Sequence, residues 1–152
     1  LKFKDCEFDA VIASDILEHI EDDAKALKEW NRVLKQGGRL IIFVPAFNFL
    51  WSKHDESNMH FRRYSKSELV DRLKKSGFEI EKASYLNFAL FAPSAILKIS
   101  KKLFNAGSDD DMREAGKTTN GILLKLLELE NKILKKIPLP FGTTVFAVAV
   151  KK

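Results

Sequence analysis

The stretch Phe8-Asp9-Ala10-Val11-Ile12-Ala13-Ser14, with Asp15-Ile16-Leu17-Glu18-His19-Ile20 directly after it, decides the fold of this 152-residue chain. The first seven residues form a short apolar run between polar neighbours, which is typical of a buried β-strand. The six residues that follow read as a short turn-like segment. Because this strand begins almost at Leu1, we expect the sequence to be the later part of a larger fold.

Strands and helices alternate from this stretch onward. Asp22 and Asp23 are N-cap candidates for the first helix, and Ser65 with Glu68 forms a capping box for the second. We expect Gly37-Gly38 to end the first of these helices. Strands are expected at residues 8–14, 39–46, 78–86 and 144–150, and helices between 22 and 37, between 65 and 77, and at 88–104 and 122–137.

This alternation predicts an α/β fold with a mainly parallel, Rossmann-like sheet. The third strand is the most polar and is expected near an edge, whereas the last is apolar on both faces and is expected in the centre. We interpret residues 1–152 as a single partial domain with a helical pair, residues 88–137, inserted as a lid. The linker at 105–121 holds three glycines and an acidic run, and is predicted to be mobile.

Composition points to a soluble protein of the cytoplasm. Apolar residues make up 45% of the chain and charged residues 31%, and the single cysteine, Cys6, cannot form an internal disulfide. No apolar run approaches the length of a membrane span. The net charge is +5, but the 26 basic and 21 acidic residues are interleaved. A solvated surface explains this pattern, so nucleic acid is not the expected partner.

The chemistry is expected where parallel strands end, because ligands bind beyond the carboxyl ends of such a sheet. The first strand ends at Ser14-Asp15, and His19 follows shortly after. The second leads into a loop, Phe47 to Tyr64, that holds His54 and His60. All three histidines therefore fall in two loops over one sheet edge. His19 is the candidate general base, since an imidazole titrates near neutrality; alternatively it orients the loop through a backbone carbonyl.

Four stretches, in order, resemble class I S-adenosylmethionine-dependent methyltransferases of the type 11/12 kind. Phe8–Ile20 is similar to the family's fourth strand, and Arg32–Leu40 to the turn before its fifth. His60–Phe78 is similar to the next loop and helix, and Leu139–Gly142 to the closing segment of one bacterial branch. The resemblance implies a sheet whose last strand runs antiparallel, inserted beside the fifth.

One part of the family's pattern is missing. The glycine-rich loop that lets the backbone approach the cofactor should lie upstream of Leu1, and no G-x-G occurs in this sequence. The sequence could be a fragment, could pair with a chain that carries the front half, or could have lost cofactor binding. We favour a fragment, inactive when isolated, and expect an exposed apolar edge on the sheet.

The resemblance also implies roles for particular residues. Ser14 and Asp15 would contact S-adenosyl-L-methionine, with Phe3 near its adenine, although Asp15 could instead cap a turn. The residues expected to contact the acceptor are Trp51, His60, Arg62 and Tyr64. Arg63 is expected to pair with Asp55 or Glu56, and Glu18 either orients His19 or is a solvated carboxylate. The less favoured alternative is a metal site of Asp15, Glu18, His19 and His60, similar to that of small-RNA 2′-O-methyltransferases.

Methyl transfer to a small-molecule, lipid-linked or sugar-containing acceptor is the function we expect. The alternatives are a non-catalytic interaction module that retained the fold, and a metal-dependent RNA methyltransferase. The apolar face of 122–137, flanked by lysines, fits a lid, a surface that lies on a membrane, or packing on a second copy of the chain. Of these three, packing is the commoner explanation.

Overall fold

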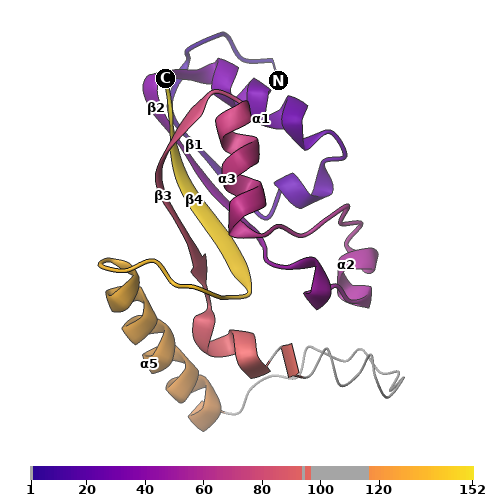
Figure 1. The fold of residues 1–152 in the computed structure, drawn as a ribbon, viewed down its shortest axis with the longest axis vertical. Coiled ribbons are helices and arrows are strands. Elements are labelled where there is room, and N and C mark those ends of the chain that lie inside the picture. Colours follow the sequence, from indigo (N-terminus) through magenta and orange to yellow (C-terminus); the bar gives the residue numbers. More distant parts are fainter. Residues whose placement is uncertain (1, 94, 97–116) are drawn as a thin grey trace.

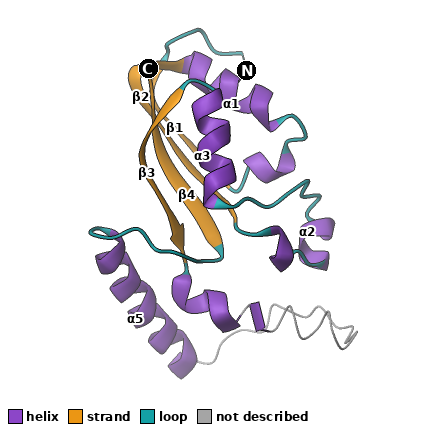
Figure 2. Ribbon diagram, viewed as in Figure 1, coloured by secondary structure: helices purple, strands orange, loops and turns teal. Residues whose placement is uncertain are grey.

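A computed structural model describes residues 2–93, 95–96 and 117–152. A four-stranded sheet carries helices α1 and α3 side by side on one face (Figures 1 and 2). The strands are β1 (Phe8–Ser14), β2 (Leu34–Pro45), β3 (Phe78–Leu86) and β4 (Thr144–Lys151). The helices are η1 (Leu17–His19), α1 (Asp23–Val33), η2 (Asn48–Leu50), α2 (Lys53–Ser57), α3 (Lys66–Lys75) and α5 (Lys117–Leu134).

The sheet order is β1-β2-β4-β3. β1 and β2 run parallel, whereas β4 runs antiparallel to both of its neighbours, β2 and β3. The last strand is therefore inserted in reverse between two strands of like direction, as the resemblance implied. The central place of β4 and the edge place of β3 are confirmed, and Val145, Ala147 and Ala149 of β4 are fully buried. β1 forms the other edge, where the side chain of Ile12 is 69% exposed.

Local signals define the ends of α1 and α3. The side chain of Asp22 accepts a hydrogen bond from the backbone N–H of Lys25 and so caps α1. The predicted capping box of Ser65 and Glu68 is present at the start of α3. Leu27, Trp30 and Val33 of α1 are buried, as are Leu69 and Leu73 of α3. These side chains join the core between the two helices and the sheet.

The end of α1 differs from the prediction. We expected Gly37-Gly38 to stop the helix, but α1 ends at Val33 and β2 begins at Leu34. Leu34 already pairs with Phe8 of β1, and the register then shifts before Arg39 pairs with Ala10. The two glycines therefore lie in an irregular part of the strand. A Cβ at Gly38 would lie 2.8 Å from the Lys35 carbonyl oxygen and 3.2 Å from that of Asp9, so the tight local backbone, together with the close approach of β1, favours glycine there.

The segment before β4 also departs from the predicted limits. α5 begins at Lys117 and ends at Leu134, so residues 117–121 of the predicted linker are helical. The rest of that linker, 105–116, and residues 97–104 of the predicted helix 88–104 lie outside the described residues. Glu130 of α5 accepts a hydrogen bond from the backbone of Ala89, and the Leu134 carbonyl accepts one from Lys82. None of the helices within the described ranges is long and apolar enough to span a membrane.

Candidate functional site

The carboxyl ends of β1 and β2 meet at one edge of the sheet, beside a cavity. The backbone N–H of Asp15 donates to the Phe43 carbonyl of β2, and its carboxylate accepts from the Ser14 hydroxyl at 3.0 Å. The adjacent cavity has a volume of about 240 Å³. Its lining consists of Asp15, Pro45, Leu50, Arg63, Leu90, Thr143 and Thr144. Asp15 thus lies where the sequence predicted ligand binding.

Three residues that follow strands at this edge have unusual backbone geometry. Asp15 follows β1 with φ +51°, Phe47 follows β2 with φ +57°, and Asn87 follows β3 with φ +59°. Aspartate and asparagine tolerate positive φ, but for a phenylalanine it is strained by about 1–3 kcal/mol. The Phe47 ring stacks on Tyr85 with a centroid distance of 4.9 Å and also contacts Phe91. Aromatic packing therefore holds this edge of the sheet in a strained conformation.

Two loops bring Glu18, His19 and His60 together at this edge. The backbone N–H of Phe61 donates to the Glu18 carbonyl at 2.8 Å and so joins the loop after β1 to the loop after β2. The rings of His19 and His60 meet edge to face at 4.6 Å. One ligand atom from each of the three side chains lies within 4.8 Å of the others. The prediction that the loop histidines lie over a common edge is confirmed for this pair.

Glu18 is the unexpected member of the group. The sequence allowed a solvated carboxylate, but the residue is only 1% exposed. Neither of its carboxylate oxygens has a hydrogen-bond partner among the described residues. Burial raises the pKa of Glu18 to about 7, because the low-dielectric surroundings disfavour the charged form. Nothing in the residue spacing signalled this burial, since it results from the loop that folds over Glu18.

Asp55 organises the loop on the other side of the group. It is fully buried and accepts hydrogen bonds from Arg63 Nε at 2.7 Å, from His60 Nδ1 at 2.9 Å and from the backbone of Ser52. Burial by itself would raise the pKa of Asp55, but these donors, Arg63 above all, outweigh it and lower the pKa to about 2. The expected pairing of Arg63 is thereby confirmed. The carboxylate of Asp55 also fixes His60 through Nδ1, which leaves Nε2 of that ring for a ligand.

Two of the residues predicted to contact the acceptor have structural partners instead. Tyr64 is 1% exposed, and its hydroxyl donates to the Asp23 carboxylate at 3.0 Å. Its side chain therefore lies in the core and cannot reach an acceptor in this structure. Arg62 pairs with the same carboxylate at 2.9 Å and donates to the Glu21 carbonyl. Asp23, at the start of α1, anchors this loop, a role that the sequence did not indicate.

The remaining predicted residues divide between the two ends of the sheet. Trp51 is half-buried in the loop after β2, with its indole N–H directed to Glu56 at 3.4 Å. Phe3 packs edge to face on Phe8, before β1 begins. The seven residues of β1, at about 3.3 Å each, separate Phe3 from Asp15 by roughly 20 Å. Phe3 thus lies beside the start of β1, and its expected contact with the adenine of the cofactor stays a prediction.

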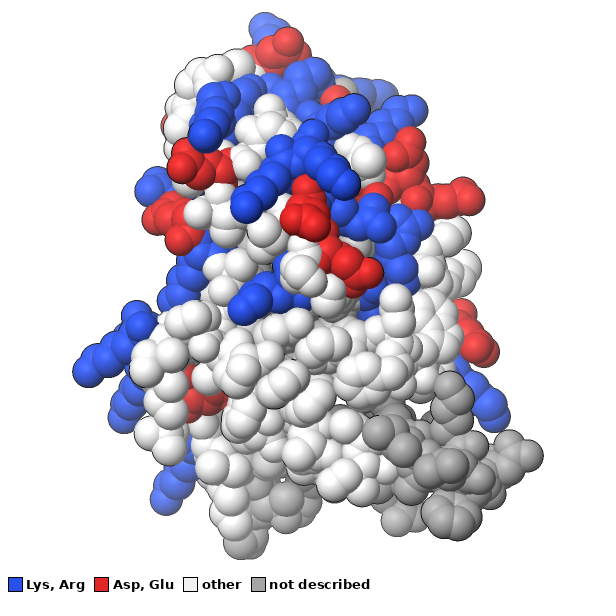
Figure 3. All heavy atoms as spheres, viewed as in Figure 1, with Lys and Arg blue, Asp and Glu red and all other residues white. Residues whose placement is uncertain are grey.

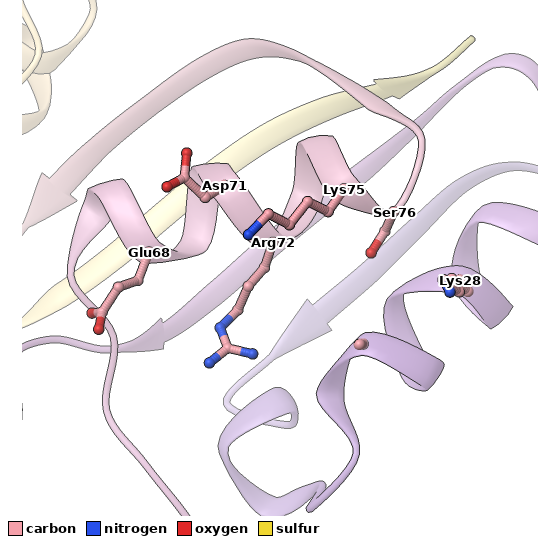
Figure 4. A pocket seen from close by; sticks show the side chains of 7 residues that line it. Lys28, Glu68, Asp71, Arg72, Lys75 and Ser76 are labelled. Carbon is pink, nitrogen blue, oxygen red and sulfur yellow. The ribbon is translucent and has the colours of Figure 1, made fainter.

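Figure 4 shows a second hollow, of about 430 Å³, between α1 and α3. Its labelled side chains are Lys28, Glu68, Asp71, Arg72, Lys75 and Ser76. Charges of both signs line it, and Arg72 is already paired with Asp23 at 2.7 Å. None of the residues predicted to carry chemistry lies in it. The candidate site is therefore the edge at Asp15, Glu18, His19 and His60.

Comparison with known proteins gives matches to part of the chain. A family model described as a methyltransferase domain matches residues 1–42. An uncharacterised protein of Methanocaldococcus jannaschii is 35% identical over 95 residues, which cover 58% of this chain and 46% of that protein. A probable S-adenosylmethionine-dependent methyltransferase of Mycolicibacterium smegmatis is 31% identical over 83 residues, 53% of this chain and 32% of that protein. The chain thus spans less than half the length of these two curated relatives.

Solved structures show the same fold. A Thermotoga maritima S-adenosylmethionine-dependent methyltransferase, described as a possible histamine N-methyltransferase, superposes with a TM-score of 0.57 at 23% identity. The superposition covers all of this chain and 60% of that one. The residues that match the family model, 1–42, include β1 and the greater part of β2. The chain is therefore similar to methyltransferases over part of its length, and its fold is that of S-adenosylmethionine-dependent methyltransferases.

Proposed function

We propose that the protein transfers a methyl group from S-adenosyl-L-methionine to an acceptor held over the carboxyl edge of β1 and β2. The observation that carries this proposal is that the loop after β1 holds both Asp15, in the wall of a cavity, and His19, which meets His60 of the facing loop. In open sheets this edge is where ligands bind. The bound cofactor would supply an electrophilic methyl group, so the protein's task is to position the acceptor and remove a proton.

The residues at this edge fit part of the cofactor. The cavity of about 240 Å³ is smaller than the 300–1,000 Å³ of a typical small-molecule site. It has an acidic group, Asp15, at one wall and apolar side chains, Leu50 and Leu90, at others. The carboxylate suits a cationic or hydroxylated part of a ligand, and the apolar side chains suit a flat or aliphatic part. The chain has no G-x-G loop to hold the remainder.

His19 is the residue we assign to proton removal. Its side chain is exposed at the edge, so an acceptor can reach it, and its ring meets the His60 ring edge to face. The backbone of η1 fixes its position, because the N–H of His19 donates to the Ile16 carbonyl at 3.1 Å. Arg63 and Asp55 support the opposite loop by their buried ion pair. The acceptor is therefore expected to lie between the two loops.

A lipid-linked acceptor is the class that the surface supports. Four exposed apolar residues lie along one face of α5, and a fifth follows in the turn after it: Ile122, Leu126, Leu129 and Ile133, and then Ile137. We call this set the α5 stripe. Lys125, Lys132 and Lys136 fall beside it on the helical wheel, a pattern of helices that lie on anionic membranes. Figure 3 shows this end of the molecule as a broad uncharged surface with basic side chains at its margin.

Helix α5 and the carboxyl ends of β1 and β2 lie at the same end of the sheet (Figure 1). Phe141, in the segment that leads from α5 to β4, contacts both Phe91 at 5.6 Å and Phe47 at 6.5 Å. Aromatic packing thus connects the loop after β2 to the chain beside α5. A membrane in contact with the stripe would present a lipid-linked acceptor near this edge.

The test of methyl transfer is a calorimetric titration of S-adenosyl-L-methionine into the protein as its own gene encodes it. We expect Asp15→Ala to weaken binding about tenfold, and His19→Ala to lower the methylation rate while it leaves cofactor affinity unchanged. Asp9→Ala, at the exposed start of β1, is the matched control and should change neither. Failure of the wild-type protein to bind the cofactor would refute the proposal and favour a non-catalytic module.

The test of the acceptor class is sedimentation with lipid vesicles. The protein should sediment with vesicles that contain phosphatidylglycerol and not with phosphatidylcholine alone, and added salt should weaken the binding. Leu126→Glu and Leu129→Glu should each abolish it, because they place a charge within the α5 stripe. Asn131→Glu, on another face of the helix, is the control. Equal sedimentation of all variants would refute the membrane role of the stripe.

A further inference from the structure

Glu18, His19 and His60 form a compact set of potential metal ligands. Their ligand atoms all lie within 4.8 Å of one another, and they come from two loops that the Phe61–Glu18 backbone hydrogen bond joins. Glu18 is buried, the His60 side chain is 11% exposed, and His19 is exposed. The set is therefore closed on the protein side and open to solvent at His19. An ion could enter from that side, and a ligand could reach it there.

The buried carboxyl group of Glu18 has neither a hydrogen-bond donor nor a counter-ion among the described residues. Burial of a polar group without a hydrogen bond costs about 1–3 kcal/mol, and burial of an unpaired charge costs more. Neither oxygen of Glu18 has a partner within the described ranges. Arg63, a buried cation of the facing loop, directs its Nε and Nη2 to Asp55 instead. A bound cation would supply the missing charge.

Hydrogen bonds behind His60 hold its ring in a form that suits a metal ligand. Its Nδ1 lies 2.9 Å from Asp55 Oδ1, and Asp55 is in turn held by Arg63 and Ser52. Metal-bound histidines usually donate their second ring N–H to a carboxylate, which fixes the ring and makes the other nitrogen more basic. Because the Asp55 carboxylate stays ionised, it accepts this hydrogen bond at neutral pH. The Nε2 atom of His60 is then the atom available to a metal.

We propose that Glu18, His19 and His60 bind one divalent transition-metal ion of the zinc class, with an open coordination position toward solvent. Two imidazoles and one carboxylate suit Zn²⁺ and its neighbours better than Mg²⁺, which prefers oxygen ligands. Asp15, a member of the four-residue set considered from the sequence, lies outside this group of three. The site is thus narrower than the sequence suggested.

The catalytic meaning of the ion rests on the proposed function. A metal ion lowers the pKa of an oxygen bound to it, so it would promote loss of a proton from an acceptor hydroxyl at the open position. In the metal-loaded protein His19 is then a ligand, and the assignment of His19 as general base holds for the metal-free protein. Metal binding itself needs neither cofactor nor acceptor. The two proposals can therefore fail independently.

The test is a competition titration of Zn²⁺ against a chromophoric chelator, with protein freed of metal beforehand. We expect one ion per chain and a rise in melting temperature on metal addition. Glu18→Gln, His19→Gln and His60→Gln should each weaken zinc binding at least tenfold. His54→Gln is the matched control, because His54 lies in the same loop but bonds Asn58 and is not in the group. Mg²⁺ should not compete with Zn²⁺ at equal concentration.

Two outcomes would overturn the proposal. One is wild-type protein that binds zinc no more tightly than the His19→Gln variant, whose exposed position leaves the core undisturbed. The other is a loss of zinc binding in His54→Gln as large as that in His19→Gln or His60→Gln. Zinc binding would then depend on the number of histidines and not on the geometry of the three ligands. Circular dichroism of each variant without metal separates loss of the site from loss of the fold. In either outcome Glu18 would be a buried carboxyl group without an ion.

Discussion

Replacement of Asp55 by alanine gives the strongest test of how the site is held together. Asp55 is fully buried and pairs with Arg63, which is 9% exposed, through two hydrogen bonds of 2.7 and 3.0 Å. Asp55→Ala would leave a guanidinium buried without its carboxylate, which typically costs about 3–5 kcal/mol. For a domain of this size each kcal/mol lowers the melting temperature by about 2–4 °C. We therefore expect a fall of roughly 6–20 °C.

The assay is urea unfolding followed by circular dichroism, with two comparisons. Asp9→Ala breaks an exposed pair with Lys35, whose side chains are 86% and 47% exposed, and should cost less than about 1 kcal/mol. The double variant Asp55→Ala with Arg63→Met removes the orphaned charge and should be less destabilised than the sum of its single variants by about 1–3 kcal/mol. A cost for Asp55→Ala as small as that for Asp9→Ala would refute this reasoning.

The same residue predicts a dependence on acidity. The pKa of Asp55 in the folded protein, about 2, lies below the ordinary value of 3.8. The contribution of Asp55 to stability is therefore fully present well above pH 3.8 and is lost as the pH falls toward 2. The difference in unfolding free energy between wild type and Asp55→Asn should accordingly shrink across that range. A difference that stays constant from about pH 6 to about pH 2 would contradict the assignment.

Three further changes test other parts of the structure. Gly142→Ala should destabilise the protein by about 2–3 kcal/mol, because the new Cβ would lie 2.0 Å from the Leu86 carbonyl oxygen. Gly121→Ala should instead stabilise α5 by about 0.5–1 kcal/mol, because a Cβ there would meet nothing within 4 Å. Thermal melts of both variants test these two expectations. Tyr64→Phe should cost about 1–2 kcal/mol in urea unfolding through loss of its hydrogen bond to Asp23, and no loss would mean that the bond is not formed. With chelator present, Glu18→Gln should gain up to about 2 kcal/mol of stability relative to wild type as the pH rises from about 4.5 to 7. The reason is that the raised pKa of Glu18 makes its ionisation unfavourable in the folded protein. A difference in unfolding free energy between the two proteins that does not change with pH would argue against this burial.

The strained edge links the fold to the site. Phe47 keeps its positive φ because its ring is packed between Tyr85, Phe91 and Phe141, which come from three other segments. The same packing places the Phe47–Tyr64 loop over the end of β1, where the Phe61 backbone meets Glu18. The position of His60 therefore depends on contacts far from His60 itself. Substitutions in the aromatic group are expected to disturb the site without touching it.

Sequence patterns predicted the secondary structure where the signal is local. The N-cap at Asp22 and the capping box at Ser65 depend on side chains within three residues of each other, and both are present. The start of β2 depends on the pairing of Leu34 with Phe8, so its limit could not be predicted from the glycines alone. The same distinction holds in the site. His19 and His60 come together because parallel strands end at one edge, a rule that needs only the order of strands and helices along the chain.

The sequence by itself determined the α/β class, the central place of the last strand, the edge that carries the histidines and the resemblance to methyltransferases. Each of these follows from apolar periodicity or from short motifs, which are properties of neighbouring residues. Only the tertiary structure decided that Glu18 is buried without a partner among the described residues, that Tyr64 and Arg62 bind Asp23, and that Phe3 packs on Phe8. The reason is physical: burial and ion pairing arise from contacts between segments 41 residues apart, as for Tyr64 and Asp23, and no local pattern encodes which of these contacts form.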